Sequence, residues 1–232
     1  MTNILDLIGL QKAYGKNIVL FVESLAIREK EFVGIVGNNG AGKTTMLSLI
    51  LDLIKPTKGF IKSKTRLVSN TEDWKKYTGS YLNENFLIPF LTPIEFLEFI
   101  GSLYGKTSKD IYKFLEDNSS FNTKEFYTKK YIRELSSGNK TKLGLLASII
   151  SDPEMLILDE PFLNLDPSSQ SWLKTKLKNL NENGVTILLS SHDLKHVTEI
   201  CTRILLLENG IIIKDLCPNN DTLVKLENYF HA

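Results

Sequence analysis

Eight consecutive residues carry the most specific chemistry in the chain. The pattern G-x-x-x-x-G-K-[ST], which binds phosphate groups, is matched at every fixed position by Gly37-Asn38-Asn39-Gly40-Ala41-Gly42-Lys43-Thr44. The glycines let successive backbone N–H groups turn inward toward an anion. Lys43 would reach the β- and γ-phosphates of a nucleotide, and the Thr44 hydroxyl would hold Mg²⁺. The alternative is a glycine turn with a structural role only.

The segments on either side of this loop favour phosphate binding. Phe32–Val36 is an almost continuous apolar run, the pattern of a strand buried on both faces. After the loop, residues 45–54 are rich in apolar side chains and predict a largely buried helix that ends before Lys55-Pro56. Such a helix adds the partial positive charge of its N-terminus to the site. Strand, glycine loop and helix together are the context that a phosphate-binding loop requires.

Two adjacent acidic residues follow a second buried strand. The strand is predicted by Met155-Leu156-Ile157-Leu158, and Asp159 and Glu160 stand at its C-terminal end, where open α/β sheets bind ligands. Asp159 would hold Mg²⁺, usually through water, and so complete the site that Thr44 begins. Glu160 is placed to polarise an attacking water as a general base. Taken alone, the pair could also be a strand followed by a polar loop, but the phosphate-binding loop favours the catalytic role.

Composition narrows the kind of partner and compartment. The 232 residues carry a net charge of +1, so the chain lacks the overall basic field that nucleic-acid binders use. Two cysteines, Cys201 and Cys217, are too few for a disulfide framework and suit a reducing compartment. Neither a signal segment nor an uncharged apolar run of membrane-spanning length is recognisable. We therefore expect a cytoplasmic protein that reaches a membrane only through a partner.

From about residue 81 to residue 135 the pattern becomes helical. Thr92-Pro93-Ile94-Glu95 is a strong helix start, with Thr92 as N-cap and Glu95 closing a capping box. The apolar face of this helix is expected to consist of Phe96, Phe99, Ile100 and Leu103. A second helix is predicted over Ser108–Asp117. The apolar run from Asn85 to Leu91 lies in a predicted loop, where it could form an interface or pack inside this helical lobe.

The remaining segments alternate between strands and helices on both sides of the lobe. Before the lobe we expect strands over residues 4–10, 18–27, 60–62 and 66–69, and a short helix over 73–77. After the lobe we expect helices over 142–151, 169–181, 194–201 and 223–230, and strands over 155–158, 185–189, 204–207 and 211–213. The last two strands flank Asn209-Gly210, the commonest two-residue hairpin turn.

The segment between the two phosphate-site motifs resembles a known family. Leu135-Ser136-Ser137-Gly138-Asn139 is similar to the Leu-Ser-Gly-Gly-Gln signature of the ATP-binding subunits of ABC transporters. The resemblance covers essentially the whole chain, including Asn164-Leu165-Asp166 as the dimer-contacting loop and His192 as the switch histidine. Tyr14 falls where the family has an aromatic side chain that stacks on adenine. The ending, Leu226-Glu227-Asn228-Tyr229-Phe230, resembles the exporter branch that moves polysaccharides, drugs or antimicrobial peptides.

This resemblance implies a fold class and a domain organisation. The fold would be α/β, a P-loop NTPase core of the RecA-like type with a small antiparallel β subdomain and an inserted helical subdomain. Residues 1–232 would form one ATPase domain. Its α/β core would comprise residues 1–80 and 141–232, and residues 81–140 would form the helical lobe that carries the signature.

The resemblance also implies how ATP is bound. The nucleotide would be bound by Gly37–Thr45 and by Tyr14. Two subunits would sandwich two ATP molecules head to tail, with Ser136 and the Gly138 backbone of one subunit meeting the γ-phosphate on the other. The second subunit could be identical or related. A transmembrane permease would be the further partner, so the chain would lie on the inner face of the cell membrane, and no nucleic-acid partner is expected.

Four positions depart from the family pattern. Ser137 replaces the first signature glycine, Asn139 replaces the glutamine, and Asn164 stands where a small Ser or Gly is common. Glu84 stands where many relatives carry a glutamine that touches Mg²⁺ or water, so it is a candidate metal ligand or a plain surface acid. Tyr14 could instead be a packed strand-end aromatic, and His192 an incidental loop histidine.

Other functions remain open at this point. A mechanical ABC ATPase acting on ribosomes or DNA usually carries two such domains or a long coiled coil, and this chain has neither. A P-loop kinase for a small metabolite would not need the signature at residues 135–139. A non-hydrolysing nucleotide-binding regulator would not need Lys43, Asp159 and Glu160 together.

Overall fold

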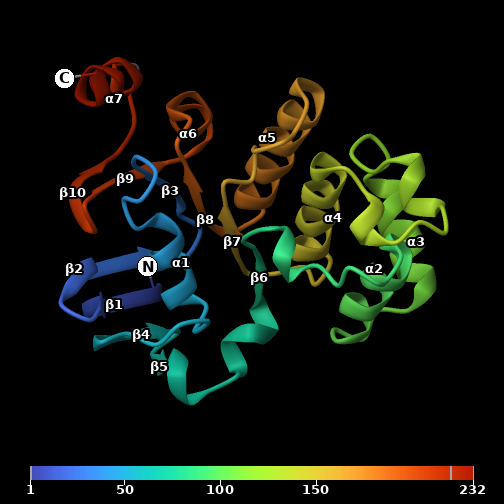
Figure 1. The fold of residues 1–232 in the computed structure, drawn as a ribbon, viewed down its shortest axis with the longest axis horizontal. Coiled ribbons are helices and arrows are strands. Elements are labelled where there is room, and N and C mark those ends of the chain that lie inside the picture. The colour runs from blue at the N-terminus through green and yellow to red at the C-terminus, as the bar shows by residue number, and fades with distance from the viewer. Residues whose placement is uncertain (1, 220, 232) are drawn as a thin grey trace.

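The computed structural model describes residues 2–219 and 221–231, and one mixed sheet runs through it (Figure 1). The order of its strands is β5-β4-β1-β2-β10-β9-β3-β8-β7-β6. The strands are β1 (Asn3–Tyr14), β2 (Asn17–Arg28), β3 (Phe32–Val36), β4 (Lys58–Ser63), β5 (Arg66–Leu67), β6 (Thr78–Tyr81), β7 (Met155–Asp159), β8 (Thr186–Ser191), β9 (Arg203–Glu208) and β10 (Ile211–Leu216).

Seven α-helices accompany the sheet in the described ranges. They are α1 (Lys43–Ile50), α2 (Pro93–Ser102), α3 (Ser108–Asp117), α4 (Ser137–Ile149), α5 (Pro167–Glu182), α6 (Leu194–Ile200) and α7 (Thr222–His231). Short 3₁₀ turns connect them, of which η2 (Asp73–Tyr77), η3 (Glu84–Phe86) and η4 (Lys124–Tyr127) matter below. A membrane span needs a longer and more apolar helix than any in these ranges.

The sheet has a parallel and an antiparallel part. Strands β6, β7, β8, β3 and β9 run parallel to one another, whereas β1, β2, β4 and β5 form antiparallel pairs. The two parts meet where β10 lies beside β2, at the register pair Ile211 and Phe21. The Phe21 N–H donates to the Gly210 carbonyl at 2.7 Å at this junction. The antiparallel part expected from the sequence is therefore continuous with the core sheet.

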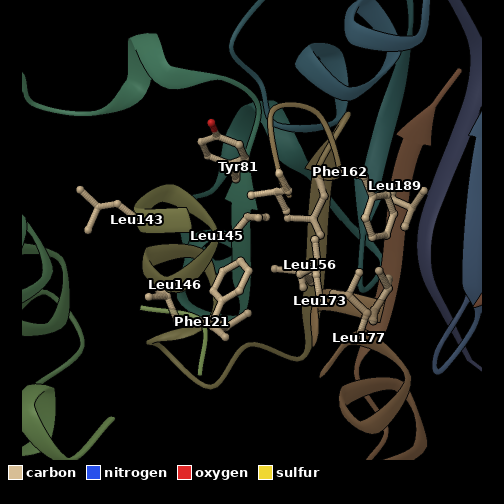
Figure 2. Close-up of a cluster of buried hydrophobic side chains, with 14 of the residues drawn as sticks. Tyr81, Phe121, Leu143, Leu145, Leu146, Leu156, Phe162, Leu173, Leu177 and Leu189 are labelled. Carbon is tan, nitrogen blue, oxygen red and sulfur yellow. The ribbon is translucent and has the colours of Figure 1, made fainter. Parts of the chain in front are cut away.

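Along the central strands, apolar side chains point alternately to the two faces of the sheet, and a hydrophobic cluster covers each face. In β7, Leu156 and Leu158 face the cluster formed with the helical lobe, α4 and α5 (Figure 2). Met155 and Ile157 face the opposite cluster, built around α1 and the antiparallel strands. A strand buried on both faces is a continuous apolar run, which is why this segment was recognisable from its sequence. The polar end of β7 is left at the carboxyl edge of the sheet.

The helical lobe begins where β6 ends and lies beside the sheet in Figure 1. Thr92 caps α2 and Glu95 completes the capping box, as expected. Helix α3 spans Ser108–Asp117, the predicted range, with Thr107 as its N-cap. Helix α4 leads from the lobe back to β7, so it connects the lobe to the core.

Several local predictions were wrong. The helix predicted over residues 45–54 ends at Ile50, because Asp52 adopts a left-handed conformation with φ of 53°. Helix α2 buries Phe96 and Leu97, whereas Phe99 and Leu103 are 46% and 65% exposed. The strand predicted over residues 66–69 stops at residue 67, and a 3₁₀ turn follows. Helix α4 begins at residue 137 rather than 142, because Ser136 caps it.

Candidate functional site

The glycine loop between β3 and α1 lines a hollow at the carboxyl edge of the sheet. Gly40 and Gly42 have φ of 83° and 105°, a conformation that L side chains rarely adopt. The hollow has a volume of about 290 Å³ and is lined by Tyr14, Val19, Glu160 and residues 38–45. Tyr14 is exposed at its rim. The structure therefore brings the expected aromatic side chain to the expected phosphate-binding loop.

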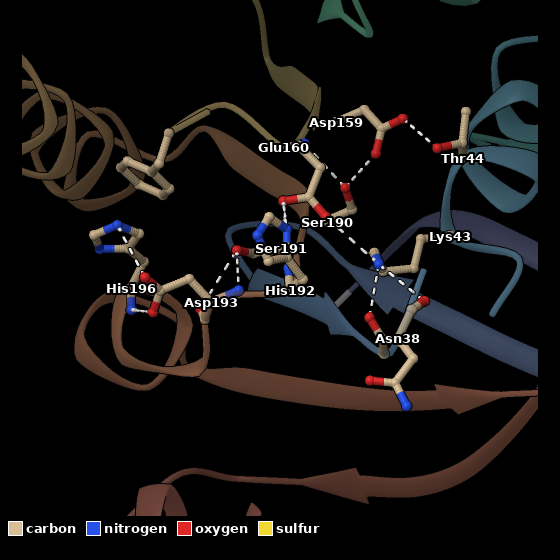
Figure 3. Close-up of polar contacts among 12 residues, drawn as sticks. Asn38, Lys43, Thr44, Asp159, Glu160, Ser190, Ser191, His192, Asp193 and His196 are labelled. Atoms are coloured by element: carbon tan, nitrogen blue, oxygen red, sulfur yellow. Dashed lines mark hydrogen bonds and ion pairs between the residues drawn. The ribbon is translucent and has the colours of Figure 1, made fainter. Parts of the chain in front are cut away.

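Lys43 is buried beneath this loop. Its ammonium group donates to the Gly37 carbonyl at 2.7 Å and to the Asn38 carbonyl at 3.3 Å (Figure 3). The same nitrogen lies 3.5 Å from Glu160 Oε1. The ammonium group is thus held between the glycine loop and the acid that follows β7, where the phosphates of a bound nucleotide would lie.

Thr44, which lines the hollow, contacts Asp159 although 115 residues separate them in the sequence. The Thr44 hydroxyl donates to Asp159 Oδ2 at 2.5 Å, and the Asp159 side chain is only 6% exposed. The other Asp159 oxygen accepts a hydrogen bond from Ser190 in the neighbouring strand β8. A hydroxyl and a carboxylate oxygen side by side are ligands that Mg²⁺ accepts, with phosphates and water completing its shell. The residues present therefore fit Mg²⁺.

Glu160 is fixed in place by its backbone and by His192. It has φ of 46°, unusual for a residue other than glycine, and its N–H donates to Ser190 Oγ at 3.0 Å. His192 Nδ1 lies 2.9 Å from Glu160 Oε2, and the His192 backbone N–H donates to the same oxygen at 3.3 Å. Because an ionised carboxylate only accepts hydrogen bonds, the pair assigns the Nδ1 proton to the histidine. Lys43, Glu160 and His192 form one chain of contacts.

Helix α6 begins directly after His192 and orients this end of the chain of contacts. Asp193 caps α6, accepting from the N–H groups of Lys195 and His196. The His196 ring packs on Phe162, two residues beyond Glu160, with ring centroids 4.4 Å apart. Burial lowers the pKa of His196, which favours its neutral form. His196 is therefore a packing residue.

The signature residues form the first turn of α4. Ser136 is the N-cap, its hydroxyl accepting from Asn139 N at 3.2 Å. Ser136 and Ser137 are exposed. The Ser137 side chain, which replaces the first glycine of the signature, therefore has room within the subunit. A Cβ on Gly138, in contrast, would lie 2.7 Å from the carbonyl oxygen of Asn164. Glycine is required at Gly138 because the predicted dimer loop crosses it closely.

Asp166 in that loop is held by several donors. It caps α5, accepting from Ser169 N at 2.9 Å and Ser169 Oγ at 2.8 Å, and it also accepts from Ser168. Lys142 of α4 lies 3.3 Å away. The Ser168 hydroxyl and the Ser169 groups hold the pKa of Asp166 well below its usual range. The loop and the signature helix are thereby joined within one subunit.

Glu84 lies away from the other candidate metal ligands. Its carboxylate pairs with Lys140 of α4 at 3.3 Å and makes no hydrogen bond or ion pair to Thr44 or Asp159 within the described ranges. The hollow is lined by Thr44 and Glu160 but not by Glu84. A role as metal ligand would therefore require Glu84 to leave Lys140.

Ser190 and Lys142 were not predicted from the sequence as functional side chains. In the sequence Ser190 stands two residues before His192, and its contacts reach 30 and 31 residues back to the acidic pair. Its signal was a polar residue at the end of a buried strand, which is the same signal that identified Asp159. Lys142 gave no signal, because its partner in the dimer loop is brought to it only by the fold.

Comparison with known proteins identifies relatives of the whole chain. Residues 22–163 match the family model described as ABC transporter. The chain is 32% identical over 226 residues to the linearmycin resistance ATP-binding protein LnrL of Bacillus subtilis, covering 94% of this chain and 73% of LnrL. It is also 32% identical to the bacitracin transport ATP-binding protein BcrA of Enterococcus faecalis, covering 93% of this chain and 70% of BcrA. Across further relatives the chain spans between 54% and 82% of their length.

Solved structures share the fold. A dimeric ATP-binding cassette, MJ0796, in a post-hydrolysis state with ADP and phosphate, superposes with a TM-score of 0.82 and 25% identity. The match covers 93% of this chain and 99% of the cassette. The expected α/β fold of P-loop NTPase type, with its mixed sheet, is thereby confirmed.

Proposed function

This chain belongs to the ABC transporter family, as a subunit that binds and hydrolyses ATP, and we propose that it powers transport by a separate membrane-spanning partner. The observation that carries the proposed chemistry is the chain of contacts from Lys43 through Glu160 to His192, beside the pair of Thr44 and Asp159. These five residues come from three separate segments, and Lys43, Thr44 and Glu160 line the hollow, while Asp159 and His192 contact Thr44 and Glu160 directly. A P-loop kinase is excluded by the family, and the intact set argues against a non-hydrolysing regulator.

In the proposed mechanism each residue has one task. Lys43 and the backbone N–H groups of residues 38–45 bind the phosphates and offset the charge that develops during transfer to water. Glu160 takes the proton of the attacking water, and His192 holds the carboxylate in position through Oε2. Tyr14 stacks on the adenine from the rim of the hollow. When bound at Thr44 and Asp159, Mg²⁺ supplies charge neutralisation to the β- and γ-phosphates, and Glu84 is its further candidate ligand.

Two subunits form the working unit in this proposal. The exposed serines of the signature and the backbone of Gly138 meet the γ-phosphate bound to the other subunit, with Asp166 in the contacting loop. The dimeric arrangement of the MJ0796 cassette supports this. The second subunit is either a copy of this chain or a related one.

The membrane partner is proposed to dock on the helical lobe. A cleft of about 380 Å³ lies between the lobe and the core, with Trp74, Phe86 and Ile100 among its lining residues. Phe86 and Phe90 are 55% and 66% exposed, and Phe99 and Leu103 of the same lobe are exposed as well. Apolar patches of this kind mark interaction sites. We propose that a transmembrane permease binds here, which places the chain on the cytoplasmic face of the membrane.

Two further points of this proposal concern direction and domain boundaries. Relatives named for linearmycin resistance and bacitracin transport support export as the direction.

We also propose a single ATPase domain, with the lobe at residues 81–140 inserted between the core segments 1–80 and 141–232. In the structure, Tyr81 ends β6 and α4 runs across residue 140, so both boundaries fall within continuous elements.

The test of nucleotide binding is Lys43→Ala. The substitution removes charge-assisted hydrogen bonds worth about 1.5–3 kcal/mol each. ATP affinity, measured by equilibrium binding of a fluorescent ATP analogue, should fall at least tenfold, and hydrolysis should fall with it. Lys16→Ala, at an exposed turn, is the matched control and should change neither. ATP hydrolysis at the wild-type rate by the Lys43→Ala protein would refute the assigned phosphate site.

A further inference from the structure

The side chain of Asn139 points into its own subunit. Asn139 is the third residue of α4, where a glutamine in a capping box would reach back to the N-cap backbone. The backbone N–H of Asn139 does donate to Ser136 Oγ at 3.2 Å. Its side-chain amide, however, donates through Nδ2 to Glu125 Oε2 at 2.7 Å. Asn139 therefore links the first turn of α4 to a different segment of the lobe.

Glu125 is well placed to act as an anchor. It lies in η4, next to Phe126, which is completely buried. Lys130 pairs with the other carboxylate oxygen at 3.1 Å, and Thr128 Oγ1 donates to the Glu125 carbonyl at 2.8 Å. The hydrogen bonds from Lys130 and then from Asn139 hold the pKa of Glu125 below its usual value. The anchor is thus an ionised carboxylate on a fixed backbone.

Exposure separates the signature residues into two groups. Ser136 and Ser137 are exposed, whereas Gly138 and Asn139 are partly buried. The groups available to another subunit are therefore the Ser136 hydroxyl and the N–H groups at the start of α4. The Asn139 amide is already committed to Glu125.

We propose that Glu125 is a positioning residue that orients the signature turn through Asn139, and that Asn139 acts within its own subunit rather than on the opposite nucleotide. The proposal rests on the ATP-bound dimer of the proposed function. If the link were absent, the Asn139 amide and the Glu125 carboxylate would each lose a partner. The first turn of α4 would then lose its side-chain link to η4, and Glu125 would keep only Lys130 as a partner for its carboxylate.

The test exchanges the donor and the acceptor of the hydrogen bond between Asn139 and Glu125 in two steps. In a Glu160→Gln background, which should hold the ATP-bound dimer, Asn139→Asp places two carboxylates opposite each other. Dimerisation with ATP and Mg²⁺, measured by light scattering over a range of protein concentrations, should weaken about tenfold or more. Adding Glu125→Gln restores a donor and an acceptor, so the double substitution should recover most of the loss. Aspartate near a helix N-terminus is favourable for the helix, and a cooperative thermal transition verifies folding.

The controls separate the possible causes. Glu116→Gln neutralises an acid of the same lobe whose side chain makes no hydrogen bond or ion pair within the described residues, so it should not rescue Asn139→Asp. Ser136→Arg should abolish the dimer in every background. If Asn139→Asp unfolds the protein, Asn139→Ala and Glu125→Ala should each weaken dimerisation, and the two losses should not add.

The outcomes distinguish this inference from the function on which it rests. A dimer that Asn139→Asp leaves intact would overturn it. Weaker dimerisation of Asn139→Asp that Glu125→Gln fails to rescue would also overturn it. An aspartate that faced the phosphates of the other subunit would repel them with either residue at position 125. A Glu160→Gln parent that stays monomeric with ATP would rule out a dimer of two copies of this chain, and with it the inference for that dimer.

Discussion

At the scale of single residues, Ser190 holds both acidic residues of the site through one hydroxyl. The Ser190 oxygen accepts the Glu160 N–H at 3.0 Å and donates to Asp159 Oδ1. Ser190 is completely buried in β8, so neither contact can be replaced easily by water. It touches no expected position of the nucleotide, and its effect on the reaction passes through the two acids.

Ser190→Ala should therefore lower catalysis more than binding. Leaving a buried donor or acceptor unpaired costs about 1–3 kcal/mol, and each 1.4 kcal/mol is tenfold in rate. We expect kcat for ATP hydrolysis to fall about tenfold to a hundredfold, with ATP affinity changed by much less. Ser63→Ala, which removes a buried hydroxyl from β4 far from the site, is the control in the same steady-state assay. An unchanged kcat for Ser190→Ala would remove Ser190 from the positioning role.

At the scale of elements, Arg203 joins the parallel and antiparallel parts of the sheet. From the start of β9 it forms a fork with Asp215 of β10, at 2.8 and 2.7 Å. It also donates to Glu31, before β3, and to the Ala26 carbonyl in β2, both at 2.9 Å. These contacts raise the pKa of Arg203, with the Asp215 hydrogen bonds as the main cause, so the guanidinium stays charged.

Arg203→Met should destabilise the fold without touching the phosphate site. The loss of the fork leaves Asp215 and the half-buried Glu31 without their cation, which should lower the free energy of unfolding by about 2–3 kcal/mol. Urea denaturation measures the change, and Arg203→Lys should recover only part of it because lysine lacks the planar fork. Arg28→Met, at an exposed position of β2, should leave the midpoint unchanged. The same midpoint of urea denaturation for Arg203→Met and wild type would contradict a stabilising role of these Arg203 contacts.

What the sequence could predict at this scale depended on the range of the interactions. Helix α3 was predicted at its observed bounds because its capping residues and apolar spacing lie within it. The apolar face of α2 was predicted only in part. Phe96 is buried and Ile100 packs against the core, but Phe99 and Leu103 are exposed, because a run of Phe, Leu and Ile does not say which side meets the core. Asp159 and Glu160 were found because a motif names them. Ser190 and Arg203 were not, since their partners are 12 to 177 residues away.

At the scale of the whole molecule, the apolar lobe surface should contact a membrane protein. Single cysteines at Phe86 or Phe90 should cross-link to a transmembrane protein in intact membranes, because both side chains are exposed and Phe86 also lines the cleft. A cysteine at Ile211 is the control, since it is equally exposed but lies in β10, at the opposite end of the molecule from α2 (Figure 1). Cross-links confined to this chain would argue against docking at the lobe.

The central claim is that the assembled site hydrolyses ATP with Glu160 as the base. Glu160→Gln keeps the shape of the side chain and an acceptor for His192, but it removes the proton acceptor for water. Lys43, Thr44 and Asp159 remain, so ATP binding should persist. Glu182→Gln, an exposed acid at the end of α5, is the matched control and should hydrolyse ATP normally.

The most direct test is the rate of ATP hydrolysis by the Glu160→Gln protein at saturating ATP and Mg²⁺. Loss of a general base typically costs about 10²–10⁴-fold in rate, and we predict a fall in that range with ATP still bound. Hydrolysis at the wild-type rate would contradict the assignment of Glu160 and the mechanism built on it.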